Sequence, residues 1–151
     1  MNEPDTSILA QLVRAKHACL VRLRDLAQRQ FALIEAGNMT ALLDLLSSKQ
    51  KPLVDLQRIE RALDAFRDQD PDQRVWPSPQ ERARCAAEVE ECNRLLHEIL
   101  AQDKRSEAAL VRRRDEVAEQ LESAHLAGRA LGAYAGPPHW ETSQVDLLSG
   151  K

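Results

Sequence analysis

The feature that most constrains the fold of this chain is a long stretch, residues 80–127, that contains neither glycine nor proline. Ala, Glu, Arg, Leu and Gln dominate it, and all five are strong helix formers. Its start is marked by Ser78-Pro79-Gln80-Glu81, in which the Ser78 hydroxyl can accept from the Glu81 amide and proline takes the first helical position. The stretch therefore predicts one continuous helix over residues 79–131.

The apolar residues of this helix recur every seven positions, but the pattern changes half-way along. One row is apolar except at Asp103, and a companion row of apolar residues turns polar after Ile99. We therefore expect the first half to bury a wide apolar face in its own molecule and the second half to present a narrow apolar seam flanked by charge. The first row is Val89, Leu96, Asp103, Leu110, Val117, Ala124 and Leu131.

Two further helices are predicted, over residues 6–36 and 39–67. Gly37 stands where a helix C-cap needs a positive φ, and the short turn after it makes the two helices antiparallel. Pro52 falls inside the second helix and predicts a kink there. Residues 68–77 are predicted to be a linker, and we expect Trp76 to pack back over the end of the bundle.

Composition agrees with an all-α fold. Aromatic residues make up 3% of the chain and there are five glycines, which disfavours β architectures, whereas 43% hydrophobic residues are enough for one core. We expect an antiparallel bundle of three long helices, with a kinked second helix and the third helix longest and overhanging. The bundle domain is predicted to span residues 1–133, and residues 134–151 to form a flexible C-terminal tail.

Charge and cysteine content narrow the class of protein further. The formal net charge is −3 with both signs interleaved, which argues against a nucleic-acid-binding surface. The N-terminus lacks a basic leader and no apolar run is long enough to span a bilayer, so we expect a soluble cytoplasmic protein without membrane insertion. Three cysteines fit a reducing compartment, and we expect them to be buried as small hydrophobic residues.

No pattern in the chain indicates catalysis or a metal. Glu122 and His125 have the spacing of one di-iron ligand pair, but a second pair is missing and both lie off the apolar seam. The basic run Arg112–Arg114 is interpreted as forming ion pairs within the helix. We therefore predict that the protein is not an enzyme and needs no cofactor or metal.

Helix lengths predict where the third helix loses its intramolecular partners. A first helix of about 45 Å that is followed by an antiparallel second one would bring Gly37 alongside residue 109 of the third helix. About 30 Å of the third helix, Leu110 to Leu131, would then remain uncovered. An uncovered apolar seam is either a self-association surface or a binding site for another amphipathic helix.

Two segments resemble the flagellar export chaperone FlgN family, which consists of small all-helical cytoplasmic proteins. The first is the turn Leu33-Ile34-Glu35-Ala36-Gly37-Asn38-Met39-Thr40-Ala41-Leu42, followed by Leu45-Leu46-Ser47-Ser48-Lys49-Gln50. The second is the close of the last helix, Leu131-Gly132-Ala133-Tyr134. The resemblance covers roughly residues 8–136, and Pro52 and the tryptophan-containing tail depart from the family pattern.

The resemblance implies a chaperone that binds the amphipathic C-terminal helices of hook-associated flagellar proteins and delivers them to the type III export gate. The predicted partner-binding residues are Leu110, Val117, Leu121, Ala124, Leu131 and Tyr134. The alternative is a cytoplasmic coiled-coil scaffold or adaptor that self-associates through its third helix as a homodimer.

Overall fold

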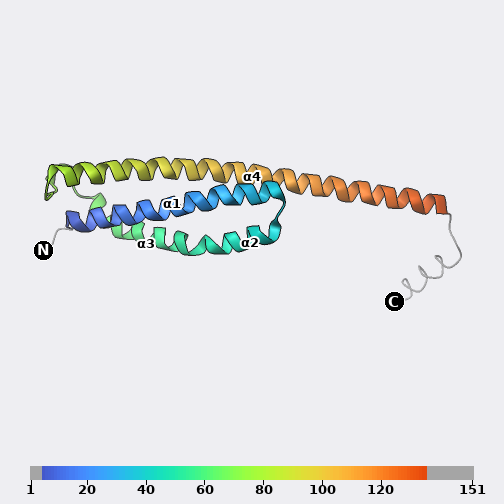
Figure 1. The fold of residues 1–151 in the computed structure, drawn as a ribbon, viewed down its shortest axis with the longest axis horizontal. Helices are drawn as coiled ribbons and strands as arrows, with labels where there is room; N and C mark the ends of the chain where they lie inside the picture. Colours follow the sequence, from blue (N-terminus) through green and yellow to red (C-terminus); the bar gives the residue numbers. More distant parts are fainter. Residues whose placement is uncertain (1–4, 136–151) are drawn as a thin grey trace. The chain divides into compact units, whose positions relative to one another are not determined.

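The computed structural model describes residues 5–135, and the fold of this part is all-α, as predicted (Figure 1). Its elements are α1 (Thr6–Ala36), α2 (Met39–Ser48), α3 (Gln50–Arg67), the 3₁₀ turn η1 (Pro71–Gln73) and α4 (Pro79–Ala135). The chain divides into two compact units, one ending at Leu110 and the other beginning at Val111. The first unit is a helical bundle, and α2 with α3 correspond to the predicted second helix.

The turn between α1 and α2 is built as the sequence predicts. Asp5 caps the start of α1 by accepting from the Ser7 amide at 3.0 Å. Gly37 ends the helix with a φ of 72°, in the left-handed region that costs other residues about 1–2 kcal/mol. The Asn38 side chain then accepts from the Ala41 amide at 3.1 Å and starts α2.

The predicted kink lies between α2 and α3, which meet at Lys49 with a bend of 28°. Pro52 has no amide proton to donate to the carbonyl of Ser48, and its ring would collide with that carbonyl in a straight helix. Lys49 keeps a helical backbone with φ −75° and ψ −19°, so that the chain bends without leaving the bundle. Pro52 itself is buried.

The core of the first unit consists of three clusters of buried side chains along the bundle. The first joins Leu9 and Val13 to Phe66 and Cys85, and the middle one joins Leu20 and Leu23 to Cys92, Leu95 and Ile99. The third joins Ile34, Leu42 and Ala109, of which Ala109 is only 1% exposed. This third cluster confirms that residue 109 of α4 lies beside the α1–α2 turn.

The segment between α3 and α4 is tied to the bundle rather than extended away from it. Arg74 donates from Nη2 to the carbonyl of Phe66 at 2.8 Å, and Thr6 donates from Oγ1 to the carbonyl of Val75 at 2.7 Å. Trp76 packs against the cluster of Leu9, Val13, Phe66 and Cys85, which confirms its predicted place. The Ser78 hydroxyl accepts from the Glu81 amide at 3.2 Å and starts α4.

Polar side chains also enter the bundle beside the bend. Lys49 donates from Nζ to Gln30 Oε1 at 2.9 Å and lies 4.0 Å from Asp103 Oδ1. That Asp103 oxygen is buried and has no hydrogen-bond partner, and neither has the buried hydroxyl of Ser106. Asp103, the polar member of the first row, and Ser106, where the companion row turns polar, thus form a polar layer between the middle cluster and the Ile34 cluster.

The end of α4 differs from the expectation. The predicted helix ends at residue 131, but α4 continues to Ala135 and includes Gly128, Gly132 and Tyr134. Glycine weakens a helix by about 1 kcal/mol relative to alanine but removes no hydrogen bond, whereas the first proline after it is Pro137. The predicted tail from residue 136 onward, with Trp140, lies outside the described residues.

Candidate partner-binding surface

The second unit, as far as it is described, contains no buried side chain. Between Val111 and Tyr134 every side chain is exposed except that of Arg113, which is partly exposed. The segment nevertheless carries large apolar residues, of which Leu121 is 67% and Leu131 71% exposed. Apolar side chains at these positions therefore do not serve the packing of the described chain.

The six predicted partner-binding residues all lie on α4 and are all exposed. Leu110 is the last residue of the first unit, and the other five belong to the second. Tyr134, which the sequence placed in the tail, is a helical residue and is 91% exposed.

Helix geometry brings four of these residues onto one side of α4. Seven residues turn an α-helix by about 700°, so Val117, Ala124 and Leu131 follow one another with a drift of about 20° each. Leu121 lies about 40° to one side of Val117. We call Val117, Leu121, Ala124 and Leu131 the seam. Tyr134 adjoins its end, about 60° around the helix from Leu131.

Two large exposed apolar residues of the described second unit, Val111 and Leu126, were not among the predicted ones. Val111 lies about 100° around the helix from Leu110, and Leu126 lies nine residues after Val117, on the opposite side of α4. Neither lies on the seven-residue row that contains Val117, Ala124 and Leu131. Leu126 is 54% exposed, similar to Val117 at 51%, and is a suitable control position.

The charges at the start of the second unit form ion pairs within the helix, as the sequence analysis interpreted them. Arg113 Nη1 lies 3.4 Å from Glu116 Oε2, and Arg114 Nη2 lies 3.3 Å from Asp115 Oδ1. Exposed ion pairs contribute at most about 1 kcal/mol each. They support the helix and flank the seam without covering it.

The cysteines all belong to the first unit. Cys85 and Cys92 are buried, and burial raises the pKa of both thiols. Cys19 is partly exposed, and burial together with the nearby Asp55 carboxylate raises the pKa of its thiol as well. Among residues 5–135, no cluster of His, Cys, Asp and Glu side chains has the arrangement of a metal site.

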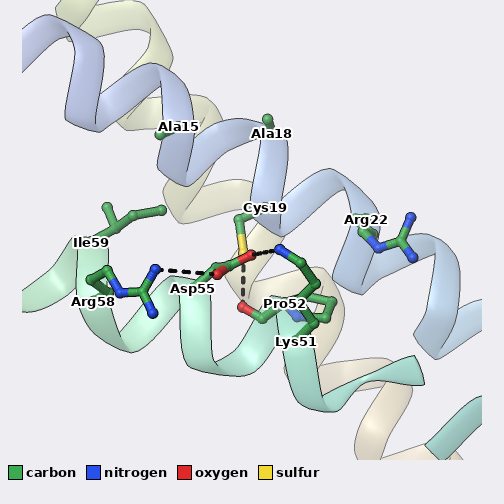
Figure 2. Close-up of a pocket in the computed structure, with 9 residues that line it drawn as sticks. All are labelled: Ala15, Ala18, Cys19, Arg22, Lys51, Pro52, Asp55, Arg58 and Ile59. Atoms are coloured by element: carbon green, nitrogen blue, oxygen red, sulfur yellow. Dashed lines mark hydrogen bonds and ion pairs between the residues drawn. The ribbon is translucent and has the colours of Figure 1, made fainter. Parts of the chain in front are cut away.

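The structure also contains a surface that the sequence analysis did not identify, a groove between α1 and α3 (Figure 2). Ala15, Ala18 and Cys19 line it from α1, and Pro52, Asp55 and Ile59 line it from α3. Cys19 donates from its thiol to the carbonyl of Pro52 at 3.0 Å across the groove floor. Only the pairing of α1 with α3 brings these residues together, so no local sequence pattern could have indicated the groove.

Within the described residues, no helix is both long and apolar enough to cross a membrane. Comparisons of the chain with protein-family models, with curated proteins and with solved structures found no match.

Proposed function

We propose that this protein binds an amphipathic helix of a client protein along the seam of α4 and acts as a chaperone in flagellar type III export. Its clients in this proposal are hook-associated proteins, recognised by their C-terminal helices and delivered to the export gate. The observation that carries the binding role is the lack of any buried side chain in residues 111–134 despite the apolar seam.

Both units expose apolar side chains, but among the described residues only the first unit also has a buried core. Exposed apolar residues occur on the first unit too, for example Leu43 and Leu100, but there they border a packed core. The seam has no such core among the described residues of its unit. An apolar row with helical spacing is complementary to the apolar face of a second helix, which is the usual helix-to-helix recognition mode.

The strength of the interaction follows from the size of the surface. Burying the three large side chains of the seam, Val117, Leu121 and Leu131, contributes roughly 4.5–9 kcal/mol in total, whereas association costs about 4–15 kcal/mol. The seam alone therefore supports weak binding, and a micromolar complex, at about 8 kcal/mol net, needs further surface. Tyr134, which adjoins the seam, is one source of that surface.

The flagellar assignment rests on the resemblance of the turn at residues 33–42 and of the helix end at residues 131–134 to the FlgN family. Two features of the chain support it. Gly37 and Asn38 form a helix–turn–helix junction that places Ala109 against the first turn of α2. In addition, Tyr134 lies on the helix that carries the seam, where it is exposed to a partner.

The test is a binding measurement with the full chain and labelled peptides that correspond to the C-terminal helices of hook-associated proteins from the same genome. Leu121→Asp should weaken binding by about tenfold to a hundredfold, because burying a leucine is worth about 1.5–3 kcal/mol and the carboxylate resists desolvation. Leu126→Asp, on the opposite side of α4, is the matched control and should bind as the unchanged chain does.

Three results would contradict the proposal. Binding that persists in Leu121→Asp would remove the seam from the interface, and equal loss in Leu126→Asp would indicate a general effect on the helix. If none of these peptides binds and light scattering shows a dimer that survives dilution, the self-associating scaffold is the better description.

A further inference from the structure

The groove beside α1 continues past the part shown in Figure 2 and runs along much of the bundle. A second hollow, between α1 and α2, adjoins the first at Arg22, which lines both. Together they follow α1 from Ala15 to Leu33. Eighteen residues of helix rise by about 27 Å, so the groove matches a partner helix of nearly five turns. It lies wholly within the first unit and uses no residue of the seam.

The floor of the groove is apolar, and on the α1 side it consists partly of short alanine side chains. Ala15, Ala18 and Ile59 line the first hollow, and Leu33 and Ala41 line the second. Alanines on α1 let another backbone come close, because nothing beyond Cβ projects from the helix there. The walls are helices whose backbone amides and carbonyls bond within the helix, so a partner must be recognised through side chains, which favours a helix over an added strand.

The rim of the groove has an excess of positive charge. Lys51 and Arg58 lie 3.1 and 3.9 Å from the Asp55 carboxylate, so one carboxylate serves both (Figure 2). Arg22 and Arg29 are exposed on the α1 side and have no ion-pair partner among residues 5–135. They stand seven residues apart, about 10.5 Å along one side of α1. Asp44 is the one further acidic residue that lines the groove.

From these dimensions and charges we infer that the groove is a docking site for an acidic amphipathic helix of another protein. The partner helix has small or medium apolar residues toward the floor and carboxylates about seven residues apart that meet Arg22 and Arg29. A fourth helix in this position converts the three-helix arrangement into a four-helix one. Complementary rim charges determine which helix binds and how fast, more than how tightly.

The experiment uses the full chain and two labelled synthetic helices of about 18 residues, identical except that glutamates seven residues apart in one are lysines in the other. Fluorescence anisotropy should show the glutamate helix binding about tenfold more tightly than the lysine helix at low salt, with the difference shrinking as salt is added. The double variant Arg22→Glu, Arg29→Glu should reverse the preference. Both positions are exposed, so circular dichroism should show unchanged helicity.

Two controls separate the groove from the seam. Ala18→Trp, which fills the groove from an exposed position, should weaken binding of the glutamate helix, whereas Leu121→Asp should leave it unchanged. Amide chemical-shift changes on titration of the unchanged chain should cluster at residues 15–33 and 41–59.

Several outcomes would overturn the inference. The first is equal affinity for the two helices, and the second is no binding of the glutamate helix at about a hundred micromolar, a concentration at which a weak complex is still detected. The third is loss of binding of the glutamate helix in Leu121→Asp. A fourth is a change in the sedimentation of the chain alone in the double arginine variant, which would make a second copy the occupant. Because the seam is not involved, each result is independent of the client-binding test above.

Discussion

At the scale of single residues, the most consequential contact is that of Lys49. Its ammonium group donates to Gln30 and lies near a buried, otherwise unpartnered oxygen of Asp103. Lys49 lies at the bend between α2 and α3 that Pro52 causes. The bend and the polar layer therefore occur at the same level along the bundle axis. A buried polar group tolerates the loss of its partner poorly, because the group that remains has neither water nor protein to bond to.

We predict that Lys49→Met destabilises the bundle by about 1 kcal/mol, because Gln30 loses its hydrogen-bond donor, whereas the Asp103 side chain, 45% exposed, stays partly hydrated. Replacing Asp103 by leucine in the same chain should recover part of that loss, since the buried Asp103 oxygen without a hydrogen-bond partner is then removed. Urea unfolding followed by circular dichroism measures both. Lys51→Met is the control, because Lys51 is exposed and pairs only with Asp55, and it should change stability by less than about 0.5 kcal/mol. Equal losses at the two lysines would contradict the polar layer.

The turn glycine gives a second residue-scale prediction. Gly37→Ala should destabilise the chain by about 1–2 kcal/mol, because its φ of 72° is unfavourable for any residue with a Cβ. The added methyl group itself meets nothing within 4 Å, so the cost is backbone strain alone. Urea unfolding tests this prediction, and an unchanged midpoint would mean that the turn relaxes into another conformation.

At the scale of elements, α4 consists of two halves that are stabilised differently. Up to Ala109 it packs into the three core clusters, whereas residues 111–134 bury no side chain. Helical structure in the second half therefore depends on intrinsic propensity and on pairs such as Arg113 with Glu116. Gly128 and Gly132 are the weakest positions in it.

We expect Gly128→Ala and Gly132→Ala to stabilise the second half of α4, the opposite sign from Gly37→Ala. Neither added methyl group meets an atom within 4 Å, and each change should gain about 0.5–1 kcal/mol in helix propensity. Amide hydrogen exchange at residues 111–134 should slow by about two- to fivefold per substitution. Faster exchange would show that the glycines serve a purpose other than local helicity.

How much of these elements the sequence could predict depends on the range of the interaction involved. The Gly37 cap, the bend at Pro52 and the cap at Ser78 follow from local backbone chemistry, and the meeting of Ala109 with the turn follows from helical rise. The sequence predicts the end of α4 four residues too early, because the glycines and prolines after Leu131 together indicate a stop, whereas only proline removes a hydrogen bond.

The sites show the same limit. The exposure of the seam could be predicted because it needed only helix lengths, although its role as a partner-binding surface stays a prediction. The groove and the Lys49 contact could not be predicted, because each depends on which side of α1 faces α3 or α4. Side-chain spacing within one helix does not determine which side faces a neighbour.

At the scale of the whole molecule, stability and binding are assigned to different parts of the chain. Among the described residues, every buried side chain lies before Leu110, so these residues determine the free energy of unfolding of the bundle. A chain that ends at Leu110 should therefore unfold with nearly the same midpoint and the same urea dependence as the full chain, because little buried surface is removed. Urea unfolding of both chains measures this, and a clearly lower midpoint would show that the second unit contributes to the core.

The position of Trp76 gives the molecule a spectroscopic reporter of its own. The indole packs on the cluster that joins α1, α3 and α4, so its emission should shift toward longer wavelengths once those helices separate and water reaches it. In a Trp140→Phe chain it is the sole tryptophan. Ligands that bind the groove or the seam should then leave the emission maximum of Trp76 unchanged. Any loosening of the bundle at its linker end would shift that maximum to longer wavelength.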